Sequence, residues 1–106
     1  MQSLNKTITQ KKANLLTAIA HPNRIKILEE LRTEIKCNCE LAPALGLEQS
    51  NLSRHLKVLT QSGILISWKD GLRVNYKIAD ARIFKILDQI ESVALRTVPV
   101  LESEED

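Results

Sequence analysis

Two short helical patterns joined by a tight turn are the feature of this sequence that most restricts its fold. The second pattern covers residues 50–61, where three leucines recur at positions i, i+4 and i+7 and therefore share one helix face. The first pattern covers residues 39–45, with Asn38 as its expected N-cap and Gly46 as its end. Two helices separated by about four residues form a helix-turn-helix motif.

A β-hairpin is predicted directly after the second of these helices. An Asp-Gly pair at residues 70–71 separates two apolar-rich runs, 64–69 and 72–78, which is a strong hairpin signal. Apolar and mostly basic side chains alternate in the second run, so one face is expected to be apolar and the other largely basic. Trp68 and Tyr76 are assigned to the apolar face, as core residues. A helix-turn-helix followed by such a hairpin is a winged helix.

Three further helices are predicted, over residues 9–20, 22–31 and 80–98. Pro22 fits the first turn of the second one, where its missing N–H costs nothing. The last helix carries a longer apolar stripe than the small domain can cover, so it is expected to form a homodimer interface with the first helix. The alternative is that it folds back onto its own domain. The fold class is therefore mainly α with a β-hairpin wing (α+β), with four helices before the hairpin and one after it.

Length and charge bound what the chain can do. Its 106 residues suit one domain, assigned to residues 1–101, followed by an acidic tail at 102–106. Four of the 13 acidic residues lie in the last five positions, so the domain carries 15 basic residues against nine acidic ones. That balance suits a polyanionic partner, although a merely solvated surface has the same composition. No apolar run approaches the ~20 residues that cross a bilayer, so a cytoplasmic protein without a membrane partner is expected.

The exposed face of helix 50–61 carries only hydrogen-bonding groups. Such a face can read base edges in the major groove, with Arg54 pairing with guanine and Asn51 with adenine, although it could also be an ordinary solvated face. Basic residues of the hairpin can contact phosphates, which positions the duplex without reading its sequence. His55 lies beside the leucines, so packing within the protein and DNA contact both stay open. The predicted DNA-contacting residues are Ser50, Asn51, Ser53, Arg54, Lys57, Gln61, Lys69, Arg73 and Lys77.

The two cysteines, Cys37 and Cys39, are separated by one residue. A disulfide between them would close a very small ring, so free thiols are expected. The sequence contains neither a phosphate-binding glycine loop nor a paired carboxylate cleft, and no cysteine with a well-placed histidine. An enzyme is therefore not expected.

Three segments together resemble the ArsR/SmtB family of metal-sensing repressors. Residues 20–28 read Ala-His-Pro-Asn-Arg-Ile-Lys-Ile-Leu, residues 49–56 read Gln-Ser-Asn-Leu-Ser-Arg-His-Leu, and the Asp-Gly hairpin follows. The resemblance covers about residues 11–98. It implies a winged-helix homodimer joined through its first and last helices, an operator of double-stranded DNA with two half-sites, and repression that an inducer relieves. No cofactor is implied for DNA binding itself.

Residues 37–41, Cys-Asn-Cys-Glu-Leu, resemble the Cys-Val-Cys-Asp-Leu signature of the arsenic-sensing branch. This resemblance implies that Cys37 and Cys39 bind the inducer, with the helix start and Lys36 favouring the thiolate form. Thiolates select thiophilic ions, so As(III) or Sb(III) is the first choice, with cadmium, lead or zinc behind. Ala42 stands where that branch often has a third cysteine, so the third ligand stays open between a small thiol, water and Glu40.

The second sensing site of the family uses Asp and His residues of the last helix. This sequence has Asp80, but Arg82, Val93 and Arg96 stand where the histidines would be. A zinc or nickel site is therefore not expected there.

Beside a repressor released by a metalloid or metal, two functions stay open. The same cysteines could sense oxidants or reactive sulfur, or the winged helix could be a module for protein contacts. The cysteines could also be inert buried residues.

Overall fold

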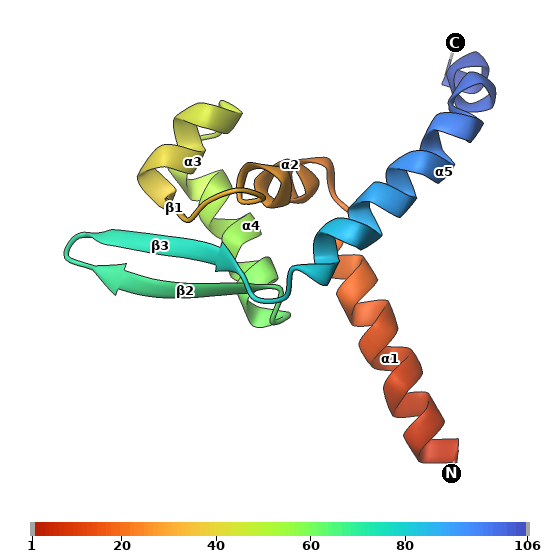
Figure 1. The fold of residues 1–106 in the computed structure, drawn as a ribbon, viewed down its shortest axis with the longest axis horizontal. Coiled ribbons are helices and arrows are strands. Elements are labelled where there is room, and N and C mark those ends of the chain that lie inside the picture. The colour runs from red at the N-terminus through yellow and green to blue at the C-terminus, as the bar shows by residue number, and fades with distance from the viewer. Residues whose placement is uncertain (1, 106) are drawn as a thin grey trace.

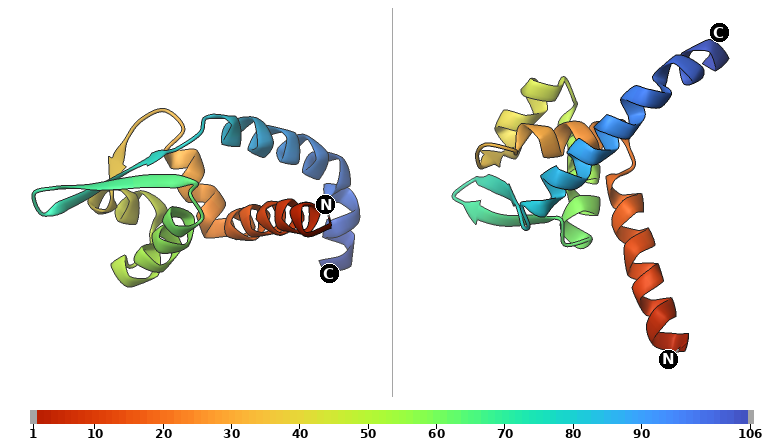
Figure 2. Two further views of the ribbon diagram at one scale, coloured as in Figure 1. Left: turned by 90° about the horizontal axis from the view of Figure 1, so that it is seen from below. Right: turned by 45° about the vertical axis from the view of Figure 1, so that its right-hand side comes forward.

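The chain folds as a winged helix with a long helix at each end (Figure 1). The structure is a computed structural model that describes the backbone of residues 2–105 and the surroundings of the side chains of residues 7–97. Helices α1 and α5 diverge from the body in Figure 1 and in the right-hand view of Figure 2, whereas the left-hand view shows that both extend from the same side of it. The predicted order of helices and hairpin is confirmed. The elements are α1 Gln2–Ile19, α2 Pro22–Glu30, β1 Lys36–Cys37, α3 Asn38–Leu45, α4 Gln49–Gln61, β2 Leu65–Asp70, β3 Arg73–Ile78 and α5 Arg82–Glu105.

Both terminal helices are longer than predicted. Helix α1 begins at Gln2 and α5 continues to Glu105, so the backbone of the predicted acidic tail is helical up to that residue. The tail's side chains, and all of Asp106, lie outside the described residues. Within the described part of the chain, no helix is both long and apolar enough to cross a membrane.

The core lies where α2, α3 and α4 meet. The three leucines predicted to line one face of α4 are almost completely buried there. Each side chain of this size stabilises the fold by about 1.5–3 kcal/mol when it is fully buried. Helix α4 is thereby fixed by one face, which leaves its opposite face free. The largest fully buried aliphatic side chains are Ile27, Leu28, Leu41, Leu52, Leu56 and Leu59.

The turn between α3 and α4 forms as predicted, whereas the start of α3 differs. Gly46 ends α3 with φ 65°, a left-handed conformation that favours glycine. The N-cap is Cys37 rather than Asn38, and Oε1 of Glu40 accepts a hydrogen bond from the Cys37 backbone N at 2.9 Å. Asn38 instead accepts from the backbone N of Val74 through Oδ1 at 3.5 Å. The asparagine therefore connects α3 to the hairpin instead of capping its own helix.

A third strand that the sequence did not predict joins the hairpin. Strand β1 pairs antiparallel with β3, with Lys36 opposite Tyr76 and Cys37 opposite Asn75, which gives the sheet order β1-β3-β2. Two residues are too short for a periodic pattern, so this strand follows from tertiary pairing alone. The cysteine segment is consequently part of the same sheet as the wing.

The assignment of Trp68 to the core is wrong, whereas that of Tyr76 is confirmed. Directly opposed residues of an antiparallel pair share a sheet face. Trp68 opposes Asn75 and Ser67 opposes Tyr76, so the two aromatic side chains lie on opposite faces. Tyr76 packs against the core, and this burial raises the pKa of its hydroxyl. Trp68 lies on the outer face and is 37% exposed.

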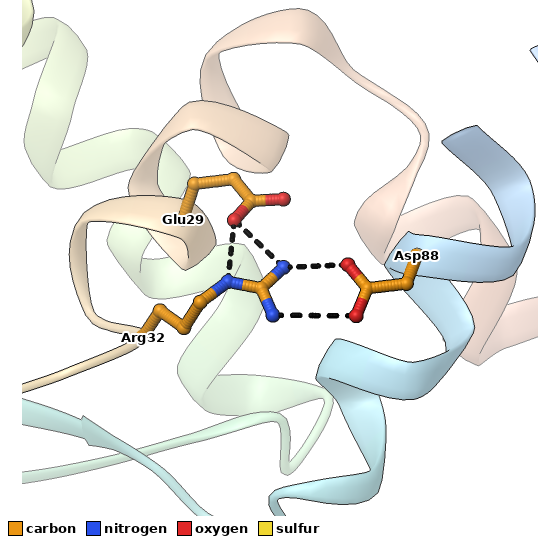
Figure 3. Close-up of polar contacts among 3 residues, drawn as sticks. All are labelled: Glu29, Arg32 and Asp88. Atoms are coloured by element: carbon orange, nitrogen blue, oxygen red, sulfur yellow. Dashed lines mark hydrogen bonds and ion pairs between the residues drawn. The ribbon is translucent and has the colours of Figure 1, made fainter. Parts of the chain in front are cut away.

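A charged cluster joins the start of α5 to the end of α2 (Figure 3). Arg32 donates from Nε to Glu29 Oε1 at 2.8 Å and from Nη2 to Asp88 Oδ1 at 3.0 Å. Its guanidinium also lies over the Phe84 ring, 4.7 Å from the centroid. Because Phe84 and Asp88 are one helical turn apart, these contacts fix the first turns of α5 against the body.

Candidate DNA interface and cysteine site

The free face of α4 carries the residues predicted to read DNA. Their side chains are exposed, apart from that of Asn51, which is half-buried. Arg54 donates from Nη2 to Asn51 Oδ1 at 2.9 Å, so the two predicted base-reading side chains are already ordered against each other. The structure thus brings together on one helix face the predicted set of Ser50, Asn51, Ser53, Arg54, Lys57 and Gln61.

The three basic wing residues do not all lie on one face. Lys77 opposes Ile66 and Arg73 opposes Asp70, which places both basic residues on the outer face with Trp68. Lys69 opposes Val74 and therefore belongs to the other face of the sheet. The outer face of the wing accordingly has an indole whose two diagonal neighbours on β3 are cations.

Cys37 and Cys39 form a disulfide, with 5.2 Å between their Cα atoms. The expectation of free thiols is wrong for this structure. Two residues apart on a regular helix would point their side chains in different directions, but Cys37 is the N-cap and has the extended angles φ −88° and ψ 164°. Its side chain therefore turns toward Cys39, and the Cα separation lies within the usual disulfide range of about 4.4–6.8 Å.

The two sulfurs have different surroundings. Cys37 is 1% exposed, whereas Cys39 is exposed. Arg73 places Nη2 3.7 Å from Cys37 Sγ, which brings a wing cation against the buried sulfur. Lys36, expected to favour the thiolate, is instead paired with Glu30 through its Nζ at 2.9 Å. The cation beside the cysteine pair is therefore supplied by β3.

The predicted metal position at Cys37 and Cys39 gains no further protein ligand among the described residues. Among the described residues, no group of three or more His, Cys, Asp or Glu side chains is arranged to hold a metal ion. At the start of α5, Asp80 accepts hydrogen bonds from the backbone N of Arg82 at 2.9 Å and from its Nη2 at 2.6 Å. These contacts with Arg82 lower the pKa of the Asp80 carboxyl to about 2.

One cluster was missed by sequence reasoning. The rings of His21 and His55 lie 4.4 Å apart, and Arg24 Nη1 lies 3.2 Å from His55 Nδ1. His55 is 8% exposed, so of its two open roles the structure supports packing and hydrogen bonding. Burial, followed by the nearby charges of His21, Arg24 and Arg54, lowers the pKa of His55. The only signal was that both histidines belong to the two characteristic motifs at 20–28 and 49–56.

Comparison with known proteins points consistently to bacterial regulatory proteins. A model described as "Bacterial regulatory protein, arsR family" matches residues 21–67. The HTH-type transcriptional regulator NmtR of Mycobacterium tuberculosis is 35% identical over 73% of this chain and 64% of its own length, so the match spans just under two thirds of that relative. The crystal structure of M. tuberculosis Rv0081 has a TM-score of 0.75 at 35% identity, covering 93% of this chain and 97% of that one.

A further solved structure supports the fold alone. The homodimeric winged helix-turn-helix DNA-binding domain of Mb0332 from Mycobacterium bovis has a TM-score of 0.77 at 24% identity, covering 88% of each chain. The winged-helix prediction is thereby confirmed. These relatives are transcriptional regulators by name, in agreement with the expectation of a regulator rather than an enzyme.

Proposed function

The chain belongs to the arsR family of bacterial regulatory proteins, and from this we propose that it is a homodimeric repressor whose binding to operator DNA is controlled at Cys37 and Cys39. The observation that carries the proposal is the convergence of these two cysteines on a segment that pairs with the wing. A change at the sulfurs can therefore act directly on the wing, which is predicted to contact DNA. We expect such a protein to act in the cytoplasm.

The support for DNA binding is the match between α4 and a major groove. One side of this helix is held in the core by leucines, and the other side presents mainly hydrogen-bonding groups, with Val58 as an exposed apolar side chain among them. Arg73 and Lys77 on the outer face of the wing would contact phosphates on either side of Trp68. In a dimer, two such units would read half-sites about 34–36 Å apart.

The support for a homodimer is the uncovered apolar surface of the terminal helices. Among the described side chains of α5, which end at Thr97, the buried ones are Ile83 and Leu87 in its first turns. Farther along the same helix, Ile90 is 54% and Val93 61% exposed, and Leu16 on α1 is 55% exposed. A second copy of the chain would cover these side chains, because contiguous apolar patches on a protein surface commonly mark an interface.

For the inducer, we propose a thiophilic ion bound by the reduced cysteine pair, with As(III) or Sb(III) as the first choice. The extended N-cap that allows the disulfide also brings two thiolates close enough to share one ion. Glu40 Oε1 already accepts a hydrogen bond from the Cys37 backbone, so the third ligand is best supplied by a small thiol or by water. Ion binding would move β1, and with it β3 of the wing. A tenfold loss of DNA affinity requires only about 1.4 kcal/mol of coupling.

The disulfide itself favours a second candidate, an oxidant sensor built on the same residues. In this reaction two thiols and one hydrogen peroxide give the disulfide and two waters. Cys39 is exposed and can meet the oxidant, and the buried Cys37 then displaces water from the oxidised sulfur. The two candidates share one site and differ only in the chemistry that changes it.

Native mass spectrometry of the reduced protein with a duplex from upstream of its own gene tests these proposals together. We expect a complex of two chains and one duplex, from which arsenite releases the DNA as each chain gains one arsenic. Release by peroxide alone, with loss of two hydrogens per chain, would favour the oxidant sensor. A chain that binds no duplex under low-salt conditions would contradict the repressor and favour a protein-contact module.

A further inference from the structure

A polar hollow of about 430 Å³ lies between the start of α2 and the face of α4. It adjoins the predicted reading surface, because Asn51 and Arg54 belong to both. No acidic side chain lines it, whereas two arginines and two histidines do. Its polar lining residues are His21, Asn23, Arg24, Asn51, Arg54 and His55.

Each of the two imidazoles of this hollow uses Nδ1 as an acceptor within the protein, which leaves its Nε2–H without an acceptor among the described residues. The backbone N of Asn23 donates to His21 Nδ1 at 3.0 Å, so the hydrogen of a neutral His21 is on Nε2. Arg24 Nη1 lies 3.2 Å from His55 Nδ1. A guanidinium can only donate, so His55 also accepts at Nδ1 and keeps its hydrogen on Nε2.

The amide of Asn51 likewise has its acceptor atom engaged within the protein. Its Oδ1 accepts from Arg54 Nη2 at 2.9 Å, which leaves the Asn51 Nδ2 group as a donor. Every buried side-chain nitrogen or oxygen among the described residues has a partner, so these remaining donors are open to solvent. Arg24 donates from Nε to the Ala18 carbonyl at 2.6 Å and from Nη2 to the Thr17 carbonyl at 3.4 Å, so this arginine is held by the protein and contributes mainly its positive charge. The hollow therefore has its acceptors engaged within the protein, while the imidazole Nε2 atoms, the Asn51 amide and the remaining N–H groups of Arg54 are the donors left for a ligand.

Such a lining fits an anion, and we propose that the hollow binds one backbone phosphate of operator DNA in each protomer. This inference rests on the proposed DNA-binding function and adds a contact to it. A phosphate brings acceptor oxygens and negative charge, which complement N–H donors and guanidinium groups. The hollow continues the α4 surface toward α2, so a duplex seated on α4 would carry its backbone past His21. The phosphate bound there would fix the register in which Asn51 and Arg54 meet the bases.

Two variants test the site without removing the residues predicted to read bases. His21→Asn keeps a side-chain oxygen that can cap α2 but removes the Nε2 donor. Asn23→Asp places a carboxylate in the hollow, in the first helical turn, where negative charge favours the helix. Lys26→Ala is the matched control, because it removes an exposed positive charge from α2 outside the hollow.

The variants are measured by fluorescence anisotropy on a footprinted upstream duplex, after thermal unfolding has shown that each is folded. We expect His21→Asn to weaken binding about tenfold and Asn23→Asp to weaken it more, in line with hydrogen bonds to a charged group. A methylphosphonate scan neutralises one phosphate of the duplex at a time. At one position per half-site, this neutralisation should lower the affinity of the wild type but should hardly lower that of His21→Asn any further. Lys26→Ala should lose the same affinity as the wild type at that position.

The proposal would be overturned if the losses of affinity from His21→Asn and from phosphate neutralisation added up at every position, or if Asn23→Asp bound DNA as tightly as the wild type. Inorganic phosphate, followed through the imidazole NMR signals of His21 and His55, separates this site from the proposed function. If inorganic phosphate shifts these NMR signals but the protein binds no duplex, the hollow is an anion site whose ligand is not DNA. If neither inorganic phosphate nor DNA moves these signals, the anion site itself is refuted.

Discussion

The guanidinium of Arg73 lies 3.7 Å from the sulfur of Cys37, although 36 residues separate them in the sequence. Arg73 begins β3 and is a predicted phosphate contact, while Cys37 is half of the proposed sensing pair. The adjacent residue Asn38 also accepts a hydrogen bond from the wing, at the backbone N of Val74. The cysteine pair is therefore joined to the wing by backbone pairing and by two side chains.

Arg73→Ala is predicted to weaken binding to all DNA sequences alike and to reduce the effect of arsenite. The first result follows from the loss of a phosphate contact, and the second from the loss of the link to Cys37. Lys77→Ala is the matched control, because Lys77 shares the outer face of the wing. In anisotropy titrations, Lys77→Ala should lose the same factor of DNA affinity relative to the wild type whether arsenite is present or absent. A selective loss of the specific operator by Arg73→Ala would contradict its role as a phosphate contact.

The stability of the fold is predicted to fall as the pH drops below about 6.5. Burial and nearby positive groups lower the pKa of His55 from its ordinary value of 6.5. The folded state therefore prefers neutral His55, and the unfolded state binds more protons at acidic pH. The stability from this residue is fully present above 6.5 and is lost as the pH falls through that value toward the lower folded-state pKa. Urea unfolding at pH 7.5 and pH 5.5 measures this, and His55→Gln should reduce the difference.

Ile90→Glu is predicted to separate the dimer into monomers and to weaken operator binding. Ile90 lies in the exposed apolar stripe of α5, where a buried charge would be costly in an interface. Ser92→Glu adds the same charge on the opposite side of that helix and should leave the dimer intact. Sedimentation velocity gives the oligomeric state of both variants. A dimeric Ile90→Glu protein would show that α5 is not the interface.

Leu56→Ala is predicted to lower the free energy of unfolding by about 2–5 kcal/mol, because it leaves a cavity in the core. Leu56 is 1% exposed, whereas Val58 on the same helix is 36% exposed. Val58→Ala should therefore change the stability much less, by about 0.5 kcal/mol. Urea unfolding of both variants checks the prediction, and similar losses would mean that α4 is not fixed by its leucine face.

Local patterns predicted the helices and the hairpin because each depends on nearby residues. The leucine spacing of α4 and the glycine after α3 were sufficient to predict these two helices, because the leucines fill the core and the glycine ends α3. The face of Trp68 was not predictable, because residues 64–66 are all apolar and do not define the phase of β2. A register shift by one residue moves every side chain to the other face of a sheet.

Contacts between distant segments were beyond a reading of local pattern. Strand β1 exists because residues 36–37 pair with β3, and nothing in those two residues requires it. The disulfide forms in spite of its small ring because Cys37 has an extended backbone, which the sequence around the cysteines does not reveal. The contact between Arg24 and His55 spans 31 residues, so the phosphate site proposed above became visible only in three dimensions.

Joint control of DNA binding by Cys37 and Cys39 is the feature on which the proposed function of this arsR-family protein depends. It is tested most directly by fluorescence anisotropy of the reduced protein on DNA from upstream of its own gene, with and without arsenite. The wild type, Cys37→Ser and Cys39→Ser should all bind the duplex, and arsenite should release only the wild type. A wild type that stays bound in arsenite, or a serine variant that is released as readily, would contradict this joint control.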